Sequence, residues 1–180
     1  DQPSYWYQHA GDGYPSFYRK KLEKLLKFQA VPPSDSRFQG LGDFKVYLKR
    51  NYELLTYRWR CSRALVKDPL ALFSVPWLVR EFDMQPVILV RHPAAFVYSV
   101  TRQGWRFDFQ QLLDQPQLMH ERLFAFRDQM MDAAGLNWSA VAEATLLWQV
   151  THTVIQQYED AYQPGWLFVR HEDLSSYPVA

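Results

Sequence analysis

The stretch "PVILVRHPAAFVYSV" (residues 86–100) carries the features that decide the predicted fold. Its opening apolar run, 86–90, is typical of a strand in a parallel sheet that is covered on both faces. The run ends at Arg91, and a His-Pro turn leads into a helix predicted over about 94–103. Ser99 lies eight residues after Arg91. A buried strand is therefore followed at once by a permanent cation and, about two turns into the next helix, by a hydroxyl group.

The second part of the chain alternates between short apolar runs and segments with helical periodicity. Ser74 stands in the N-cap position of one helical segment, whose first turn contains Pro76. This order of elements is typical of an α/β fold, a parallel sheet flanked by helices. The other expected elements are a strand at 63–69, helices at 74–82, about 117–134 and 139–162, and a strand within 165–174 that leads into a further helix.

The first part of the chain is expected to be irregular and helical. Residues 1–16 indicate a loop, and 16–28 have the apolar spacing of an amphipathic helix. After a linker at 30–42, a second helix is predicted over about 43–60. Its inner face is predicted to consist of Phe44, Tyr47, Leu48, Leu54 and Leu55. Its basic residues are interpreted as solvated, namely Lys45, Lys49, Arg50, Arg58 and Arg60.

The composition is that of one globular domain, which we divide into a helical and loop region, 1–62, and an α/β core, 63–180. The 20 basic and 19 acidic residues give no general argument for nucleic-acid or membrane binding. Cys61 is the only cysteine, so no intrachain disulfide forms and a cytoplasmic location is expected. No apolar run approaches the roughly 18–20 residues of a membrane span. Because the sequence has no initiator Met, we expect a fragment of a longer protein.

Charged groups follow each of the three predicted strands. The groups are Lys67-Asp68, Arg91-His92 and Arg170-His171-Glu172-Asp173. In open parallel sheets, ligands bind beyond the carboxyl ends of the strands, where helix N-termini also attract anions. This arrangement predicts a phosphate or sulfate ligand. From spacing alone, Arg91 either binds this ligand or makes a structural contact with a carbonyl or an acidic group. Lys67 likewise has either a functional or a structural role.

Several other nucleotide, metal and hydrolase motifs are absent from the sequence. The seven glycines form neither GxxxxGK[ST] nor GxGxxG, and no GxSxG elbow is present. HExxH and CxxC metal signatures are also missing, so no metal site is predicted. The five histidines are scattered and have no diagnostic spacing.

Residues 67–105 resemble sulfotransferases that use 3′-phosphoadenosine-5′-phosphosulfate (PAPS), especially their bacterial branch. In this family an arginine ends a core strand and a serine lies eight residues later, as Arg91 and Ser99 do here. "VRHEDL" (169–174) is similar to the family's Arg-Tyr-Glu-Asp-Leu segment, with His171 in the Tyr place. The resemblance covers about residues 60–180 and keeps the order of all three segments.

The resemblance implies a truncated sulfotransferase fold of the P-loop nucleotide-binding type that lacks its N-terminal 5′-phosphosulfate loop and its C-terminal end. Arg91 and Ser99 would bind the 3′-phosphate of PAPS or of its product PAP, and Lys67 would stabilise the transferred sulfonate or the leaving phosphate. The sulfuryl group would pass to a hydroxyl or amine of a small-molecule or glycan acceptor. Region 1–62 would build the acceptor pocket and lid. Trp148 would either contact adenine or pack in the core.

The sequence departs from the family at the general base. Many members have Lys-Thr-His where this chain has Lys67-Asp68-Pro69, so the histidine base is absent. Asp68 is either a substitute base or a turn residue. Two alternatives therefore stay open. One is another P-loop-class transferase, such as a small-molecule kinase, and the other is a non-catalytic binding module with the sulfotransferase fold.

Overall fold

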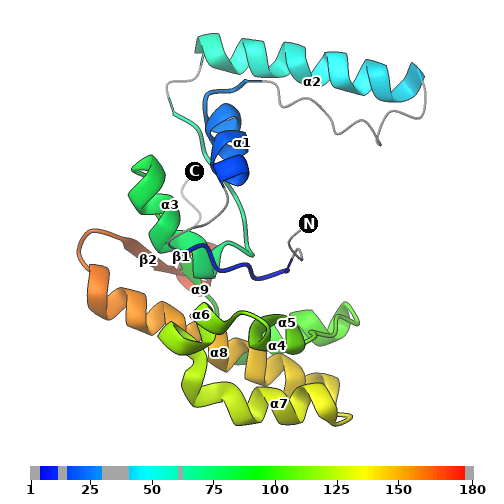
Figure 1. Ribbon diagram of the computed structural model, residues 1–180, viewed down its shortest axis with the longest axis vertical. Helices are drawn as coiled ribbons and strands as arrows, with labels where there is room; N and C mark the ends of the chain where they lie inside the picture. The colour runs from blue at the N-terminus through cyan, green and yellow to red at the C-terminus, as the bar shows by residue number, and fades with distance from the viewer. Residues whose placement is uncertain (1–4, 12–15, 30–40, 61–62, 177–180) are drawn as a thin grey trace. The chain divides into compact units, whose positions relative to one another are not determined.

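The computed structural model describes residues 5–11, 16–29, 41–60 and 63–176 of the chain. It divides into two compact units. The helical unit comprises Asp12–Asp68, and the core unit comprises Asp1–Gly11 together with Pro69–Ala180. Residues 5–11 belong to the core unit. Figure 1 labels the elements of both units.

The helical unit contains the two helices predicted from the apolar spacing. They are α1, Ser16–Leu26, and α2, Leu41–Arg60. Phe28 follows α1 with a positive φ of 51°, and its ring lies 6.2 Å from the ring of Tyr57 on α2. The predicted inner face is wrong at Leu55, which is 53% exposed, while Leu54 is half-buried. The side chains of Phe44, Tyr47 and Leu48 lie outside the described residues.

The core unit follows the predicted alternation of strands and helices. The helix predicted at 94–103 is α4, and Gly104 ends it with a φ of 67°, a conformation that glycine adopts readily. One short helix, α5, was not expected from the sequence. The first elements of the core unit are η2 (Leu72–Ser74), α3 (Val75–Phe82), β1 (Val87–Val90), α4 (Pro93–Arg102), α5 (Gln110–Leu113) and α6 (Pro116–Leu118). After α6 come η3 (Met119–Leu123), η4 (Phe124–Phe126), α7 (Arg127–Gly135), α8 (Ala140–Tyr162), β2 (Leu167–Arg170) and α9 (His171–Ser176).

The sheet of the described chain has two parallel strands, β1 and β2, in the register Val87↔Leu167 to Val90↔Arg170. The parallel pairing confirms the mixed α/β character. The prediction that both faces of the sheet are covered is wrong. Ile88 is buried, whereas Val87 and Leu89, on the other face, are 56% and 53% exposed. Helices therefore cover one face of this sheet, and the alternating side chains leave the other face open.

The predicted strand at 63–69 is wrong. Residues 63–68 are irregular and exposed, and Leu65 is 93% exposed. A strand needs a neighbour for its backbone N–H and C=O groups. This run belongs mostly to the helical unit, whereas both described strands belong to the core unit. Its apolar composition therefore does not suffice to form a strand.

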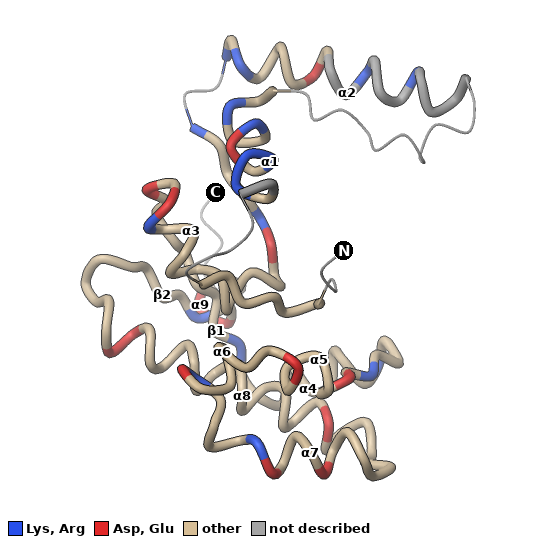
Figure 2. Tube along the Cα trace, in the orientation of Figure 1, with Lys and Arg blue, Asp and Glu red and all other residues tan. Residues whose placement is uncertain are grey.

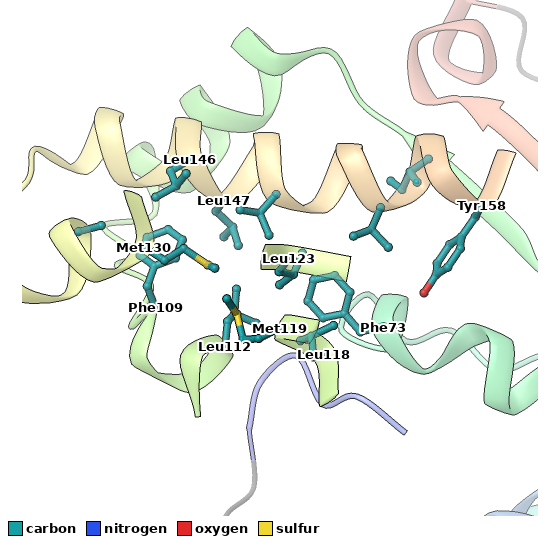
Figure 3. Packing of buried hydrophobic residues seen from close by; sticks show 14 of the residues in the cluster. Phe73, Phe109, Leu112, Leu118, Met119, Leu123, Met130, Leu146, Leu147 and Tyr158 are labelled. Carbon is teal, nitrogen blue, oxygen red and sulfur yellow. The ribbon is translucent and has the colours of Figure 1, made fainter. Parts of the chain in front are cut away.

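The hydrophobic core is built around α8. Ser139 caps this helix, since its Oγ accepts a hydrogen bond from the Ala142 N–H at 3.2 Å. One side of α8 is buried from Leu146 to Tyr158 and points toward side chains of the preceding elements, as Figure 3 shows. The fully buried partners include Phe73, Phe109, Leu112, Leu118, Leu123 and Met130.

The single helix predicted at about 117–134 is interrupted. A π-helical turn, η3, and a 3-10 turn, η4, separate α6 from α7. Leu118 and Leu123 are both fully buried although they are five residues apart. In an α-helix this spacing places two side chains on different faces, whereas the wider π turn brings them to the same side. The core therefore selects the wider turn.

Residues 5–11 cross the core unit in an irregular path that polar contacts hold. The buried amide of Gln115 accepts from the His9 N–H at 2.8 Å and donates to the Tyr7 carbonyl at 2.9 Å. Ser74 stands at the N-cap position as predicted, but its side chain makes no capping bond. Its hydroxyl donates instead to the Gln8 carbonyl at 2.5 Å, because this segment offers an acceptor there.

Candidate anion-binding site

The ends of β1 and β2 meet at one edge of the sheet. Val90 and Arg170 are register partners, so the residues that follow them leave the sheet side by side. The structure thus brings together two of the three predicted charged groups, Arg91-His92 and the group from Arg170 to Asp173. Lys67, of the third predicted group, is exposed and belongs to the helical unit.

Arg91 is the cation that follows β1 directly, and it is half-buried. Its Nε atom is buried and has no hydrogen-bond partner within the described part of the chain. Its backbone carbonyl accepts a hydrogen bond from the indole Nε1 of Trp148 at 2.9 Å. A buried donor without an acceptor is costly, and a guanidinium fork suits two oxygens of a phosphate. Arg91 is therefore held by its backbone and retains a free donor.

The start of α4 is occupied by the protein's own groups. The backbone N–H of His92 donates to Glu172 Oε1 at 2.9 Å, and the imidazole Nδ1 of His92 accepts from the Ala94 N–H at 3.2 Å. The bond from His92 is the main reason why the pKa of the Glu172 carboxyl lies below its ordinary value. Two donors expected to attract an anion are thus already used, which leaves the guanidinium of Arg91 as the stronger candidate.

Ser99 lies on α4 in the core unit and is half-buried. It stands six residues after Pro93, the first residue of the helix. At a rise of about 1.5 Å per residue, this places it about 9 Å along the helix axis. Arg91 and Ser99 therefore lie at the entrance and on the second turn of the same strand–helix connection, as the sequence predicts.

A groove of about 550 Å³ lies along α8 and is lined by Val90, the last residue of β1, which directly precedes Arg91. Trp148 is the largest side chain in its wall, and its ring stacks on that of His152 with a centroid distance of 4.2 Å. Sequence reasoning left Trp148 between adenine contact and core packing, and the structure places it half-buried at the groove. The lining residues are Val90, Phe126, Gln129, Trp148, Gln149, His152, Thr153, Ile155, Gln156 and Glu159.

His152 is a site residue that sequence reasoning missed. Its Nδ1 lies 2.9 Å from the Trp148 carbonyl, and its Nε2 is buried without a hydrogen-bond partner in the described chain. Burial lowers the pKa of this imidazole below its ordinary value. The signal available in the sequence was the four-residue spacing of Trp148 and His152, which places both rings on one side of a helix.

The described residues contain no group of three or more His, Cys, Asp or Glu side chains placed to hold a metal ion. Among the same residues, no helix has the length and apolar character required to cross a membrane.

Comparison with models of protein families, with curated proteins and with solved structures gives no match for this chain. The structure by itself defines a mixed α/β protein with a two-stranded parallel sheet in its described part. The candidate site combines an unpartnered guanidinium donor, Arg91, with a groove whose wall residue Trp148 is hydrogen-bonded to the Arg91 backbone.

Proposed function

We propose that this chain is part of a PAPS-dependent sulfotransferase in which Arg91 and Ser99 bind the 3′-phosphate of the nucleotide. The observation that carries the proposal is the buried, unpartnered Nε of Arg91 at the carboxyl edge of a parallel sheet. The proposal includes the sulfotransferase variant of the P-loop nucleotide-binding fold and a cytoplasmic location.

The 3′-phosphate suits Arg91 for reasons of charge and geometry. A phosphate dianion offers two oxygens to the guanidinium fork, and the charged hydrogen bonds satisfy the buried donor. Ser99 adds a neutral hydroxyl donor from the second turn of α4. A nucleotide without a 3′-phosphate would leave both groups unused, so the pair selects PAPS and PAP over adenosine 5′-phosphate.

The groove along α8 suits the base of the same nucleotide. Val90 lines the groove and is followed directly by Arg91, so sites for a base and for a 3′-phosphate would be neighbours. Trp148 offers an aromatic surface for adenine, and base–aromatic stacking contributes about 1–3 kcal/mol in other nucleotide sites. In this proposal Trp148 contacts adenine.

The proposed reaction is an in-line transfer. The acceptor oxygen or nitrogen forms a bond to sulfur while the bond from sulfur to the phosphate oxygen of PAPS breaks, which releases PAP. The acceptor proton passes to a base that the described residues do not identify. Lys67 would stabilise charge on the sulfonate or on the leaving phosphate, because positioning and charge stabilisation dominate such transfers.

The test is calorimetric titration of the chain with PAP and with adenosine 5′-phosphate. We expect PAP to bind more tightly and Arg91→Ala to abolish the difference. Since each hydrogen bond to a charged group contributes about 1.5–3 kcal/mol, the loss of PAP affinity should be about tenfold or more. Ser99→Ala should give a smaller loss of the same kind.

The matched control is Arg102→Ala, which removes an exposed arginine from the last turn of the same helix. It should leave the preference for PAP unchanged. Equal affinity for the two nucleotides would refute the assignment of Arg91 and Ser99.

A further inference from the structure

The charges of the chain are divided unequally between its two units. The helical unit, Asp12–Asp68, contains 13 of the 20 basic residues but only six of the 19 acidic ones, a net charge of +7. The core unit has seven basic and 13 acidic residues, a net charge of −6. Figure 2 shows Lys and Arg along α1 and α2. The net charge of +1 for the whole chain is therefore the sum of a strongly cationic helical unit and an anionic core unit.

Helix α2 displays aromatic and basic side chains together on one side. Lys45, Lys49, Tyr52 and Trp59 follow one another at intervals of four, three and seven residues, which places them on one helix face. Tyr52 and Trp59 are 73% and 88% exposed, and both lysines are exposed. We define the α2 surface as these four residues together with the exposed Leu55 and Arg60.

The other side of α2 has contacts of its own within the helical unit. Tyr57 contacts the ring of Phe28, and Leu54 is half-buried. The α2 surface therefore remains exposed in this unit despite its aromatic content. Neighbouring exposed apolar side chains of this size mark interaction sites rather than ordinary protein surface.

We propose that the α2 surface binds the face of an anionic lipid bilayer, with α2 lying in the plane of the interface. Lysine and arginine are attracted to anionic head groups, and tryptophan and tyrosine prefer the level of the head groups. Leu55 contributes an aliphatic side chain that can enter the acyl boundary.

The composition of the surface favours a bilayer over a soluble polyanion, because it includes the exposed aliphatic side chain of Leu55. A 20-residue helix is about 30 Å long, so these residues can lie along a flat interface. Nucleic acids and acidic polysaccharides are bound through their charges and ring faces, which gives no role to Leu55. The inference is independent of the proposed function, because it uses residues other than Arg91, Ser99 and Trp148.

The test is sedimentation of the chain with vesicles of phosphatidylcholine alone and of phosphatidylcholine mixed equally with phosphatidylglycerol. We expect binding to the anionic vesicles that weakens as salt is added. Lys45→Gln with Lys49→Gln should lower the partition coefficient about fivefold for each charge removed. Tyr52→Ala with Trp59→Ala should lower it at least as much.

The control variant is Tyr98→Ala with Arg102→Gln, which removes an exposed aromatic ring and an exposed cation from α4 of the core unit. It should bind vesicles as the unchanged chain does, and circular dichroism should show that all variants keep their helices. Three results would each overturn the proposal. The first is failure of the unchanged chain to bind anionic vesicles, the second is a loss of vesicle binding in the control variant as large as in the α2 variants, and the third is no loss in either α2 variant. Tighter binding of heparin or DNA through the same residues would also overturn it, in favour of a soluble polyanion.

Discussion

Trp148 and Arg91 are 57 residues apart in the sequence, and the indole N–H of Trp148 donates to the carbonyl oxygen of Arg91 at 2.9 Å. This bond fixes the end of β1 to the middle of α8, where the aromatic groove begins. The backbone of the candidate anion site is thus held by a residue of the candidate base site. Changes at Trp148 should therefore affect both.

Trp148→Phe keeps an aromatic ring but removes the donor to the Arg91 carbonyl. Losing one partner of such a bond should destabilise the chain by about 1 kcal/mol. PAP affinity should fall as well, because Arg91 is held less firmly. Urea unfolding and calorimetry measure the two effects. Trp105→Phe, at a residue that is 58% exposed, is the control. Unchanged stability and affinity would contradict the role given to this bond.

The stability of the core unit should decrease in mild acid because of His152. Burial lowers the pKa of its imidazole in the folded state below the ordinary value of 6.5. Below pH 6.5 the unfolded chain therefore binds a proton that the folded chain resists, so stability falls as the pH decreases toward the lowered pKa. Above pH 6.5 the imidazole is neutral in both states and contributes no pH dependence.

Below pH 6.5, the melting temperature should depend less on pH in His152→Leu than in the unchanged chain. His120→Leu, at an exposed histidine, serves as the control and should keep the dependence. A pH profile that is the same in all three proteins would show that His152 titrates alike in the folded and unfolded states.

Arg106 should not be replaceable by lysine. Its guanidinium donates from both Nε and Nη2 to the carboxylate of Glu143, which is 8% exposed, and also from Nη2 to the Trp138 carbonyl at 2.8 Å. A lysine provides a point charge without the planar fork. Arg106→Lys should therefore lower the melting temperature, whereas Arg102→Lys should not. Equal melting temperatures for both variants would show that the fork adds nothing.

Gln115→Ala should loosen the segment at residues 5–11. The buried amide contacts the His9 N–H and the carbonyls of Tyr7 and Gln111. Removing it leaves these backbone groups without their partner, at a cost of about 1–3 kcal/mol. Hydrogen exchange at the His9 amide should accelerate. Gln110→Ala, which removes an exposed amide, should leave this exchange rate unchanged. If exchange were unaffected by Gln115→Ala, other contacts would hold the segment.

The sequence predicts elements well where local periodicity coincides with a clear start or stop. Ser139 and Gly104 mark such boundaries for α8 and α4, and both helices occur as expected. The run around Leu65 has the composition of a strand, but strand formation depends on a partner elsewhere in the chain. Likewise, the π turn between Leu118 and Leu123 depends on the core that both residues enter.

For the candidate site, the sequence predicts that the ends of three strands lie together. The register of Val90 with Arg170 confirms this for two of them, and the third predicted strand, 63–69, does not form. It does not predict the groove or the role of His152, since both arise from the packing of α8 near the end of β1. The nucleotide specificity of Arg91 and Ser99 and the role of Lys67 stay predictions.

The open face of the sheet has a consequence for how concentrated solutions of this chain should behave. Val87, Leu89 and Leu167 are each more than half exposed, and the second edge of β1 pairs with no described strand. Such an edge is a template for another chain, so molecules should add to one another strand by strand as the concentration rises. With four residues in each strand, the contact is short, and dilution should reverse it. Association through this edge should therefore depend on the concentration of the chain.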